Sequence, residues 1–275
     1  MMDILGVGSG EDFSVALKKD GSVWTWGSHL FLGDGSTTPR ATPKQIMTDV
    51  ARVSVGLYSG LAIKNDASLW RWGTWAEDSK PFLNISPQKV IDGGVIDASA
   101  GNAHWLALKS DGTLWAWGAN ESGQLGDGTT SPRSTPIKVM SGVVRVSAGT
   151  QYSMALKADG SLWTWGQNYY WVLCDSKVQQ TSTPMKVMDG VKRFNAGYES
   201  SVIVKTDGSL WVCGAYNHEL KENGYQPKIV ATEPTQIGVG VSDAIAGYST
   251  SLALKVDHSL QQWGFNTLKF IAPEP

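Results

Sequence analysis

The sequence is poor in charge and has no long apolar stretch. Of its 275 residues only 17% are charged, and 23 Lys plus Arg stand against 25 Asp plus Glu, a formal net charge of −2. Nucleic-acid binders draw much of their affinity from basic patches that neutralise phosphates, and no run of like charge occurs here. No apolar stretch approaches the ~18 residues that a membrane-spanning helix requires. We therefore expect neither nucleic-acid binding nor membrane insertion.

Cysteine is almost absent, with only Cys174 and Cys213 in the chain. Two cysteines are too few for a disulfide framework or a thiolate zinc site. Cys213 stands where other copies of the repeat described below have Trp, which predicts a small, buried, apolar side chain. The first residues, 1–6, lack the cationic start and apolar core of a secretory signal. They leave the compartment undetermined, and an extracellular location is expected if the chain is part of a larger exported protein.

Glycine and tryptophan are abundant, with 31 and 13 residues, and they mark an internal repeat. A fixed period of 20 to 50 residues indicates stacked supersecondary units. The segment GSLWTWG, which ends at Gly166, recurs with variations at intervals of 46, 45, 48, 48 and 50 residues. Its copies end at Gly27, Gly73, Gly118, Gly166, Gly214 and Gly264. Six copies fill the chain.

The pattern within each copy predicts four short strands, because apolar runs of four to seven residues alternate with turn residues. In the fourth copy we expect strands at 144–148, 153–157, 161–165 and 184–188, with Asp159-Gly160 as a hairpin turn. Ala67 and His258 replace the turn glycine in the second and sixth copies, which predicts less stable turns there. Radial four-stranded sheets make a β-propeller. We predict an all-β, single propeller domain over 1–275, with repeats near 3–48, 49–92, 93–141, 142–190, 191–239 and 240–275.

The third copy carries the fullest motif. Gly101-Asn102-Ala103-His104-Trp105-Leu106-Ala107-Leu108-Lys109 is followed by GTLWAWG, by Asn120-Glu121-Ser122-Gly123-Gln124-Leu125-Gly126-Asp127-Gly128, by Thr135-Pro136 and by Lys138-Val139. This pattern resembles a repeat of the regulator of chromosome condensation family, as a bacterial-type member. The resemblance implies a β-propeller, commonly of seven blades, against the six counted here; seven would apply if the chain is a fragment. The family includes an exchange factor for a nuclear small GTPase and secreted inhibitors of β-lactamase.

Aromatic residues outside the repeat anchors gather in the connections between first and second strands and between third and fourth strands. In a four-stranded meander these connections emerge on one face. Tyr and Trp dominate the energetics of protein interfaces, and acidic residues such as Glu199 accompany them here. We therefore predict a partner-binding face; the alternative is ordinary loop packing. The predicted face comprises Tyr58, Trp75, Trp105, Tyr152, Tyr169, Tyr170, Trp171, Tyr198, Tyr216 and Tyr248.

Catalytic and metal-binding patterns are weak. The histidines fall in different repeats without metal-ligand spacing, and His104 occupies a recurring turn position also held by Phe13 and Tyr152, which favours turn packing. We expect a monomeric, non-enzymatic protein-interaction module without cofactor or metal. The alternatives are a structural segment of a larger bacterial surface protein, an exchange-factor-like or inhibitor-like binder, and a carbohydrate-binding protein.

Overall fold

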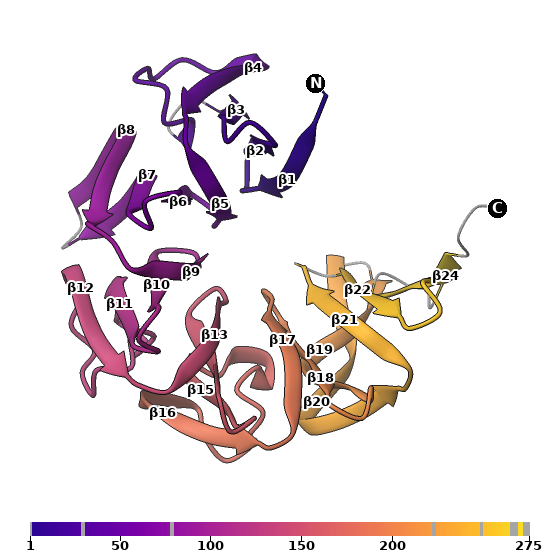
Figure 1. Ribbon diagram of the computed structural model, residues 1–275. Coiled ribbons are helices and arrows are strands. Elements are labelled where there is room, and N and C mark those ends of the chain that lie inside the picture. The colour runs from indigo at the N-terminus through magenta and orange to yellow at the C-terminus, as the bar shows by residue number, and fades with distance from the viewer. Residues whose placement is uncertain are drawn as a thin grey trace. The chain divides into compact units, whose positions relative to one another are not determined.

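The computed structural model describes residues 2–28, 31–77, 80–221, 224–247, 250–264 and 269–271. Its strands form six four-stranded antiparallel sheets, each a meander of four consecutive strands (Figure 1). The all-β architecture with six four-stranded sheets predicted from the repeat is therefore confirmed.

The strands of the first three sheets follow the predicted repeat order. The first sheet contains β1 (Ile4–Ser9), β2 (Phe13–Lys18), β3 (Val23–Gly27) and β4 (Arg40–Met47). The second contains β5 (Val50–Val55), β6 (Ser59–Lys64), β7 (Leu69–Glu77) and β8 (Lys80–Ile91). The third contains β9 (Val95–Ala100), β10 (His104–Lys109), β11 (Leu114–Gly118) and β12 (Arg133–Met140).

The last three sheets repeat the arrangement. The fourth contains β13 (Val143–Ala148), β14 (Tyr152–Lys157), β15 (Leu162–Gln167) and β16 (Gln180–Met188). The fifth contains β17 (Val191–Ala196), β18 (Ser200–Lys205), β19 (Leu210–Lys221) and β20 (Gly224–Gly238). The sixth contains β21 (Val241–Ala246), β22 (Thr250–Lys255), β23 (Leu260–Gly264) and β24 (Lys269–Ile271).

The chain divides into two compact units. The first unit comprises Met1–Glu121 and Thr129–Gln151, and the second comprises Ser122–Gly128 and Tyr152–Pro275. Within each unit, successive sheets bury apolar side chains against each other. In the first unit, Val15, Leu17 and Val23 of the first sheet pack with Val50 and Trp72 of the second. In the second unit, the fifth and sixth sheets share a comparable core that includes Trp263.

In five of the six sheets the first Trp of the anchor is held by its own hairpin; the sixth has Gln261 at that position. In the fourth sheet, the Trp163 indole Nε1 donates a hydrogen bond to Ser161 Oγ, which donates to Asp159, and the Lys157 ammonium lies over the Trp163 ring. The hydrogen bonds from Ser161 hold the pKa of the Asp159 carboxyl below its ordinary value. The same arrangement recurs in four of the other five sheets, at Trp24, Trp70, Trp115 and Trp211, with Thr113 in place of the serine beside Trp115.

Ala67 and His258 keep the turn geometry of the glycines that they replace. Their φ angles are 63° and 67°, against 82° at Gly160, and Ala67 N donates to Lys64 O at 2.9 Å just as Gly160 N donates to Lys157 O. A Cβ in the left-handed region costs roughly 1–2 kcal/mol per residue.

We therefore expect Ala67→Gly to raise the free energy of unfolding by about 1 kcal/mol, after the extra flexibility of glycine in the unfolded chain is subtracted. Urea denaturation followed by tryptophan fluorescence would measure the change. The reverse substitution, Gly160→Ala, serves as the matched control and should lower stability. A neutral or destabilising Ala67→Gly would contradict this explanation of the turn.

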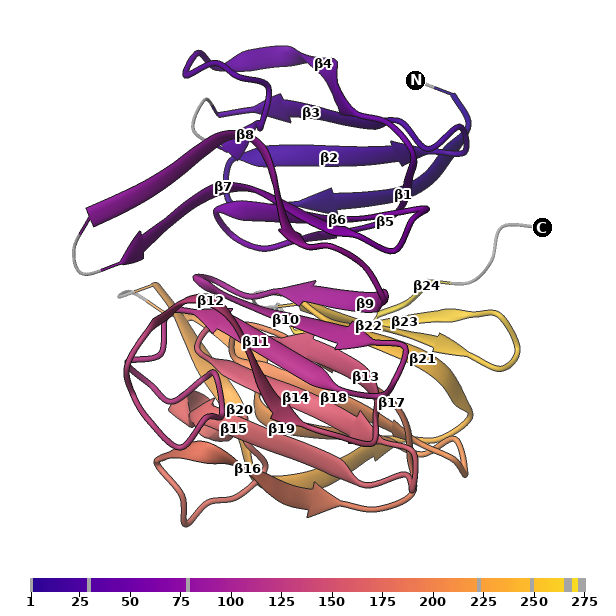
Figure 2. The same ribbon diagram turned by 60° about the vertical axis from the view of Figure 1, so that its left-hand side comes forward.

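Two connections predicted as loops are continuous hairpins. β7 pairs with β8 out to Glu77 and Lys80, and β19 pairs with β20 out to Lys221 and Gly224. Figure 2 shows the β7–β8 hairpin extending past β5 and β6. Trp75 and Tyr216 thus belong to strands, because the ladder continues beyond the anchor glycine in these two sheets.

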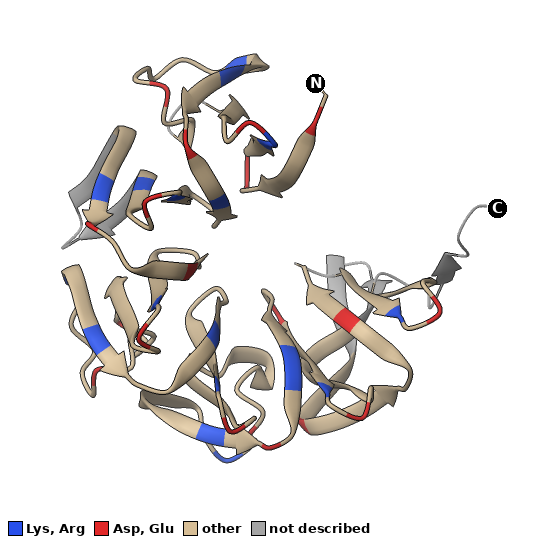
Figure 3. Ribbon diagram, in the orientation of Figure 1, with Lys and Arg blue, Asp and Glu red and all other residues tan. Residues whose placement is uncertain are grey.

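Lys and Arg positions alternate with Asp and Glu positions along the described strands and turns (Figure 3). In the described part of the chain, no helix has the length and apolar character needed to cross a bilayer.

Candidate functional site

The connection between β15 and β16 is anchored by a buried framework. The Asn168 side chain donates to Asp175 O at 2.8 Å and accepts from Leu173 N at 2.8 Å. Val172 and Leu173 are buried, and their carbonyls accept hydrogen bonds from Ser201 and Thr164. This framework fixes both ends of the short 3-10 segment η2 (Tyr169–Trp171).

A disulfide joins this connection to the fifth sheet. Cys174 is bonded to Cys213 of β19, across 39 residues of sequence, and both side chains are buried. The predicted burial of Cys213 is confirmed, but its side chain is part of a disulfide and not a free apolar group.

The disulfide takes the place of a glycine–tryptophan contact found elsewhere in the fold. Gly126 and Cys174 each lie eight residues after an anchor glycine, and both have left-handed backbones, with φ of 78° and 64°. A Cβ on Gly126 would lie 2.7 Å from the Trp165 Nε1 atom. Cys213 stands at the position of Trp165 in the next repeat, so the smaller side chain makes room for the Cβ of Cys174.

The tip of the connection exposes three consecutive aromatic residues. Tyr169, Tyr170 and Trp171, here called the aromatic ridge, are 66%, 38% and 38% exposed. Tyr170 and Trp171 adopt left-handed φ angles of 59° and 62°. Trp171 replaces the glycine found at the same place in the third repeat, Gly123, which is buried. Bulky residues in this conformation are strained, and such strain concentrates at functional sites.

A carboxylate lies beside the ridge. Partial burial first, and then the negative charge of Glu199, raise the pKa of the Tyr170 hydroxyl. Glu199 and Tyr198 belong to the turn between β17 and β18, and Tyr198 is half-buried. The second unit therefore presents the ridge, Tyr198 and Glu199 together.

Trp105 and Tyr152 are buried, with 0% and 1% of their surface exposed, so including them in the binding face was wrong. Trp105 Nε1 donates to Ser59 Oγ at 2.9 Å. The Tyr152 hydroxyl accepts from Ser201 Oγ, and burial raises its pKa. Both residues lie at the start of the second strand of their sheet. Trp105 packs against the preceding sheet, and Tyr152 packs against the following one. The recurring position shared by Tyr152, Phe13 and His104 already indicated packing.

The other residues of the predicted face are dispersed or not described. Tyr58, in the first unit, is half-buried with its ring centroid 5.5 Å from that of Phe31. Tyr216 packs at the edge of the core between the fifth and sixth sheets. Tyr248 and the side chain of Trp75 lie outside the described residues. Among the described side chains of the predicted set, Tyr198 is the one that lies with the ridge.

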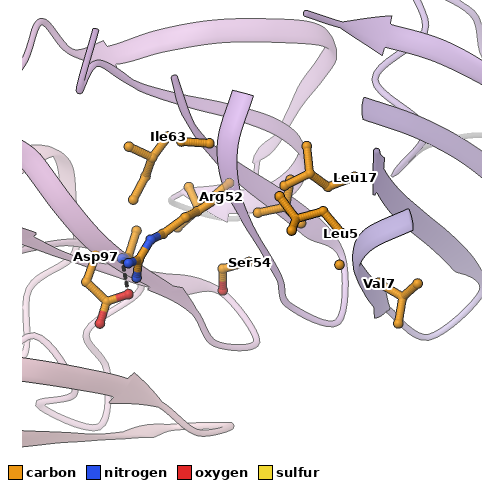
Figure 4. A pocket seen from close by; sticks show the side chains of 12 residues that line it. Leu5, Val7, Leu17, Arg52, Ser54, Ile63 and Asp97 are labelled. Carbon is orange, nitrogen blue, oxygen red and sulfur yellow. Dashed lines mark hydrogen bonds between the residues drawn. The ribbon is translucent and has the colours of Figure 1, made fainter. Parts of the chain in front are cut away.

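A separate cavity of about 410 Å³ lies in the first unit, between β1, β5 and β9 (Figure 4). Leu5 and Val7 form an apolar wall, and Arg52 extends toward Asp97. Burial raises the pKa of Asp97, and the charge of Arg52 opposes that rise. Ala100 N donates a hydrogen bond to Ser54 Oγ. The twelve lining residues include no histidine or cysteine and no paired nucleophile and base, so they assemble no catalytic set.

The described histidines, cysteines and acidic residues form no group of three or more that could hold a metal ion.

Comparison with protein families identifies the repeat. The "Regulator of chromosome condensation (RCC1) repeat" models match residues 111–156 and, in a second model of the same description, residues 4–31, 95–124 and 143–170. A search of curated protein sequences finds no significant match to the chain.

Solved structures show the same fold at low sequence identity. Yeast RCC1 (Prp20), from a structure described as Kap60 bound to yeast RCC1, is 21% identical with a TM-score of 0.80, covering 95% of this chain and 70% of that one. Human WBSCR16 is 20% identical with a TM-score of 0.78, covering 96% and 77%. Prp20p from Saccharomyces cerevisiae, described with its binding properties to Gsp1p and histones, is 21% identical with a TM-score of 0.78, covering 95% and 72%. Residues 4–31 and 95–170 thus match models of the RCC1 repeat, and the chain shares the β-propeller fold of these solved structures.

Proposed function

We propose that this chain is a non-enzymatic protein-interaction module that binds a protein partner through the aromatic ridge of its second unit. One observation carries the proposal: the β15–β16 connection keeps the buried anchors of its counterpart in the third repeat while its tip is exposed and aromatic. Asn168 and Leu173 correspond to the buried Asn120 and Leu125. The tip differs, because strained aromatic side chains replace Glu121, Ser122 and Gly123.

The energetics favour a binding role over loop packing. A packing role would bury these rings, as it does Trp105 and Tyr152, whereas Tyr169 is two-thirds exposed. Contiguous exposed aromatic surface is characteristic of interaction sites, and Trp and Tyr are enriched at interface hot spots. The rigid anchors lower the entropy cost of ordering the ridge on binding.

The similar structures support the same general use of the fold. Prp20p is described as binding Gsp1p and histones, and yeast RCC1 was solved with Kap60. Gsp1p, histones and Kap60 are partners of the yeast proteins. For this chain we propose the binding surface, the aromatic ridge, and not the identity of its partner. The exchange-factor, inhibitor, structural-segment and carbohydrate alternatives gain no specific observation from the described residues.

The test compares three immobilised baits in affinity capture from the source organism's cells and medium. They are the unaltered chain, the ridge variant Tyr169→Ala/Trp171→Ala, and the control variant Ile96→Ala/Val144→Ala, which removes apolar side chains that are 46% and 50% exposed in the first unit. We expect mass spectrometry to identify a protein retained by the unaltered and control chains and lost from the ridge variant. Equal recovery on all three baits would contradict the proposal, provided circular dichroism shows each bait to be folded.

A further inference from the structure

The third residue of the first strand in each sheet is charged in every repeat except the first. It is Gly6 in β1, whereas the later repeats have Arg52, Asp97, Arg145, Arg193 and Asp243. In β5 and β9 this residue lines the cavity of the first unit, where Arg52 extends toward Asp97 (Figure 4). Arg52 therefore has a charged counterpart on β9, and on β1 it has none.

Gly6 leaves space open beside Arg52. A Cβ on Gly6 would meet no atom within 4 Å, and Gly6 is not among the glycines with a left-handed backbone. Neither sterics nor backbone conformation thus requires glycine at this position. Because Gly6 and Arg52 both line the cavity of about 410 Å³, the missing side chain leaves part of that volume unfilled next to the guanidinium.

The Arg52 guanidinium has no hydrogen-bond or ion-pair partner among the described residues. Its side chain is exposed. Asp97 Oδ1 accepts a hydrogen bond from Ala98 N at 3.1 Å, so this carboxyl is partly satisfied by its own strand. A guanidinium presents a planar fork of N–H donors that matches the two oxygens of a carboxylate. Arg52 is therefore positioned to receive a carboxylate from outside the chain.

Apolar side chains form another wall of the same cavity. Leu5 and Val7 are 60% and 75% exposed, and the buried Leu17 and Ile63 also line the cavity (Figure 4). An aliphatic group against Leu5 and Val7 would remove apolar surface from water, which is favourable. The cavity thus combines an unpaired cation with an apolar wall.

We propose that this cavity binds a small aliphatic carboxylate, with the carboxyl group on the Arg52 guanidinium and the alkyl group against Leu5 and Val7. An inorganic phosphate would leave the apolar wall uncovered and would bring more negative charge toward Asp97, so a monovalent carboxylate is favoured. The site belongs to the first unit and does not depend on the aromatic ridge of the second.

The test follows the side-chain Nε–H signal of Arg52 in the full chain labelled with ¹⁵N in arginine, assigned from its loss in Arg52→Gln. The probe is isocaproate; isocaproamide is the neutral probe of the same shape, and acetate carries the charge with almost no apolar group. We expect the signal to shift saturably with isocaproate, at concentrations about fivefold lower than with the amide and about tenfold lower than with acetate. The signal of Arg40, which is paired with Asp34, should not respond.

Two substitutions in the cavity should change the affinity for isocaproate in opposite directions. Asp97→Asn removes a like charge, while its amide oxygen still accepts from Ala98 N, and should strengthen binding about two- to fivefold. Gly6→Asp places a carboxylate of the chain itself beside Arg52 and should weaken binding by about tenfold. Gly6→Ala is the matched control: it adds only a Cβ in open space and should leave the affinity unchanged.

Equal responses to isocaproate and isocaproamide would show that the carboxylate is not recognised, and no saturable response of Arg52 at millimolar concentration would show that the cavity does not bind this class of ligand. Either result would overturn the inference. Unchanged affinity in both Asp97→Asn and Gly6→Asp, with both variants folded by circular dichroism, would place the bound carboxylate elsewhere and overturn it as well. The capture experiment judges the aromatic ridge separately, and none of these outcomes bears on it.

Discussion

Replacing Cys174 and Cys213 together with alanine is expected to lower the free energy of unfolding of the second unit by about 4 kcal/mol. The bond closes a loop across 39 residues, and a cross-link of that span restricts the unfolded chain far more than the folded one. It also ties the aromatic ridge's connection to β19 at a point three residues after Trp171. Alanine at position 174 must still adopt the left-handed backbone conformation of Cys174 but no longer has the disulfide that holds it there.

Urea denaturation of the oxidised chain, the double variant and the oxidised chain treated with reductant would measure this effect. The reduced chain is the matched control, because it keeps both side chains and loses only the bond. We expect both to unfold at clearly lower urea concentration than the oxidised chain. A change below about 1 kcal/mol in both would show that the two cysteines are not bonded in solution.

Trp165→Ala is expected to cost about 3–5 kcal/mol, the range for a large side chain removed from a core. Trp165 is completely buried, and its Nε1 donates to Gln124 O at 2.9 Å within the second unit. The substitution leaves a cavity against Gly126 and removes a donor from a buried carbonyl.

Trp163→Ala is the matched control for this prediction, since Trp163 is the neighbouring anchor tryptophan and only half-buried. Its loss should be clearly smaller when both variants are compared by urea denaturation. Equal decreases in the free energy of unfolding would contradict the distinction drawn here. In that distinction Trp165 packs against the connection from the preceding sheet, whereas Trp163 is held by its own hairpin.

The repeat made most of the fold predictable from sequence. Anchor glycines at regular intervals and Asp-Gly turns predicted the six four-stranded sheets, and in the fourth repeat the predicted strands differ from β13, β14 and β15 by at most two residues at either end. The hairpins β7–β8 and β19–β20 were missed, because strand pairing beyond the anchor depends on cross-strand contacts that have no periodic pattern.

The candidate site was only partly predictable. The run Tyr169-Tyr170-Trp171 stood out as consecutive aromatics in a connection, and the structure exposes them. Trp105 was misassigned because its place in the sequence, next to a turn, does not reveal that the side chain turns inward. For Tyr152 the recurring position that it shares with Phe13 and His104 had indicated packing, but its aromatic character was given more weight. The Cys174–Cys213 bond required knowing that each such connection packs on the following sheet, which is a tertiary contact.

The most direct test of the central claim is the dissociation constant of the partner identified by capture, measured by isothermal titration calorimetry. Three chains are compared: the unaltered chain, the ridge variant Tyr169→Ala/Trp171→Ala and the control Ile96→Ala/Val144→Ala. Hot-spot aromatic residues contribute about 2 kcal/mol or more each. We therefore predict that the ridge variant binds at least about thirtyfold more weakly and that the control binds as the unaltered chain does. Equal affinity of all three chains would show that the aromatic ridge is not the binding surface.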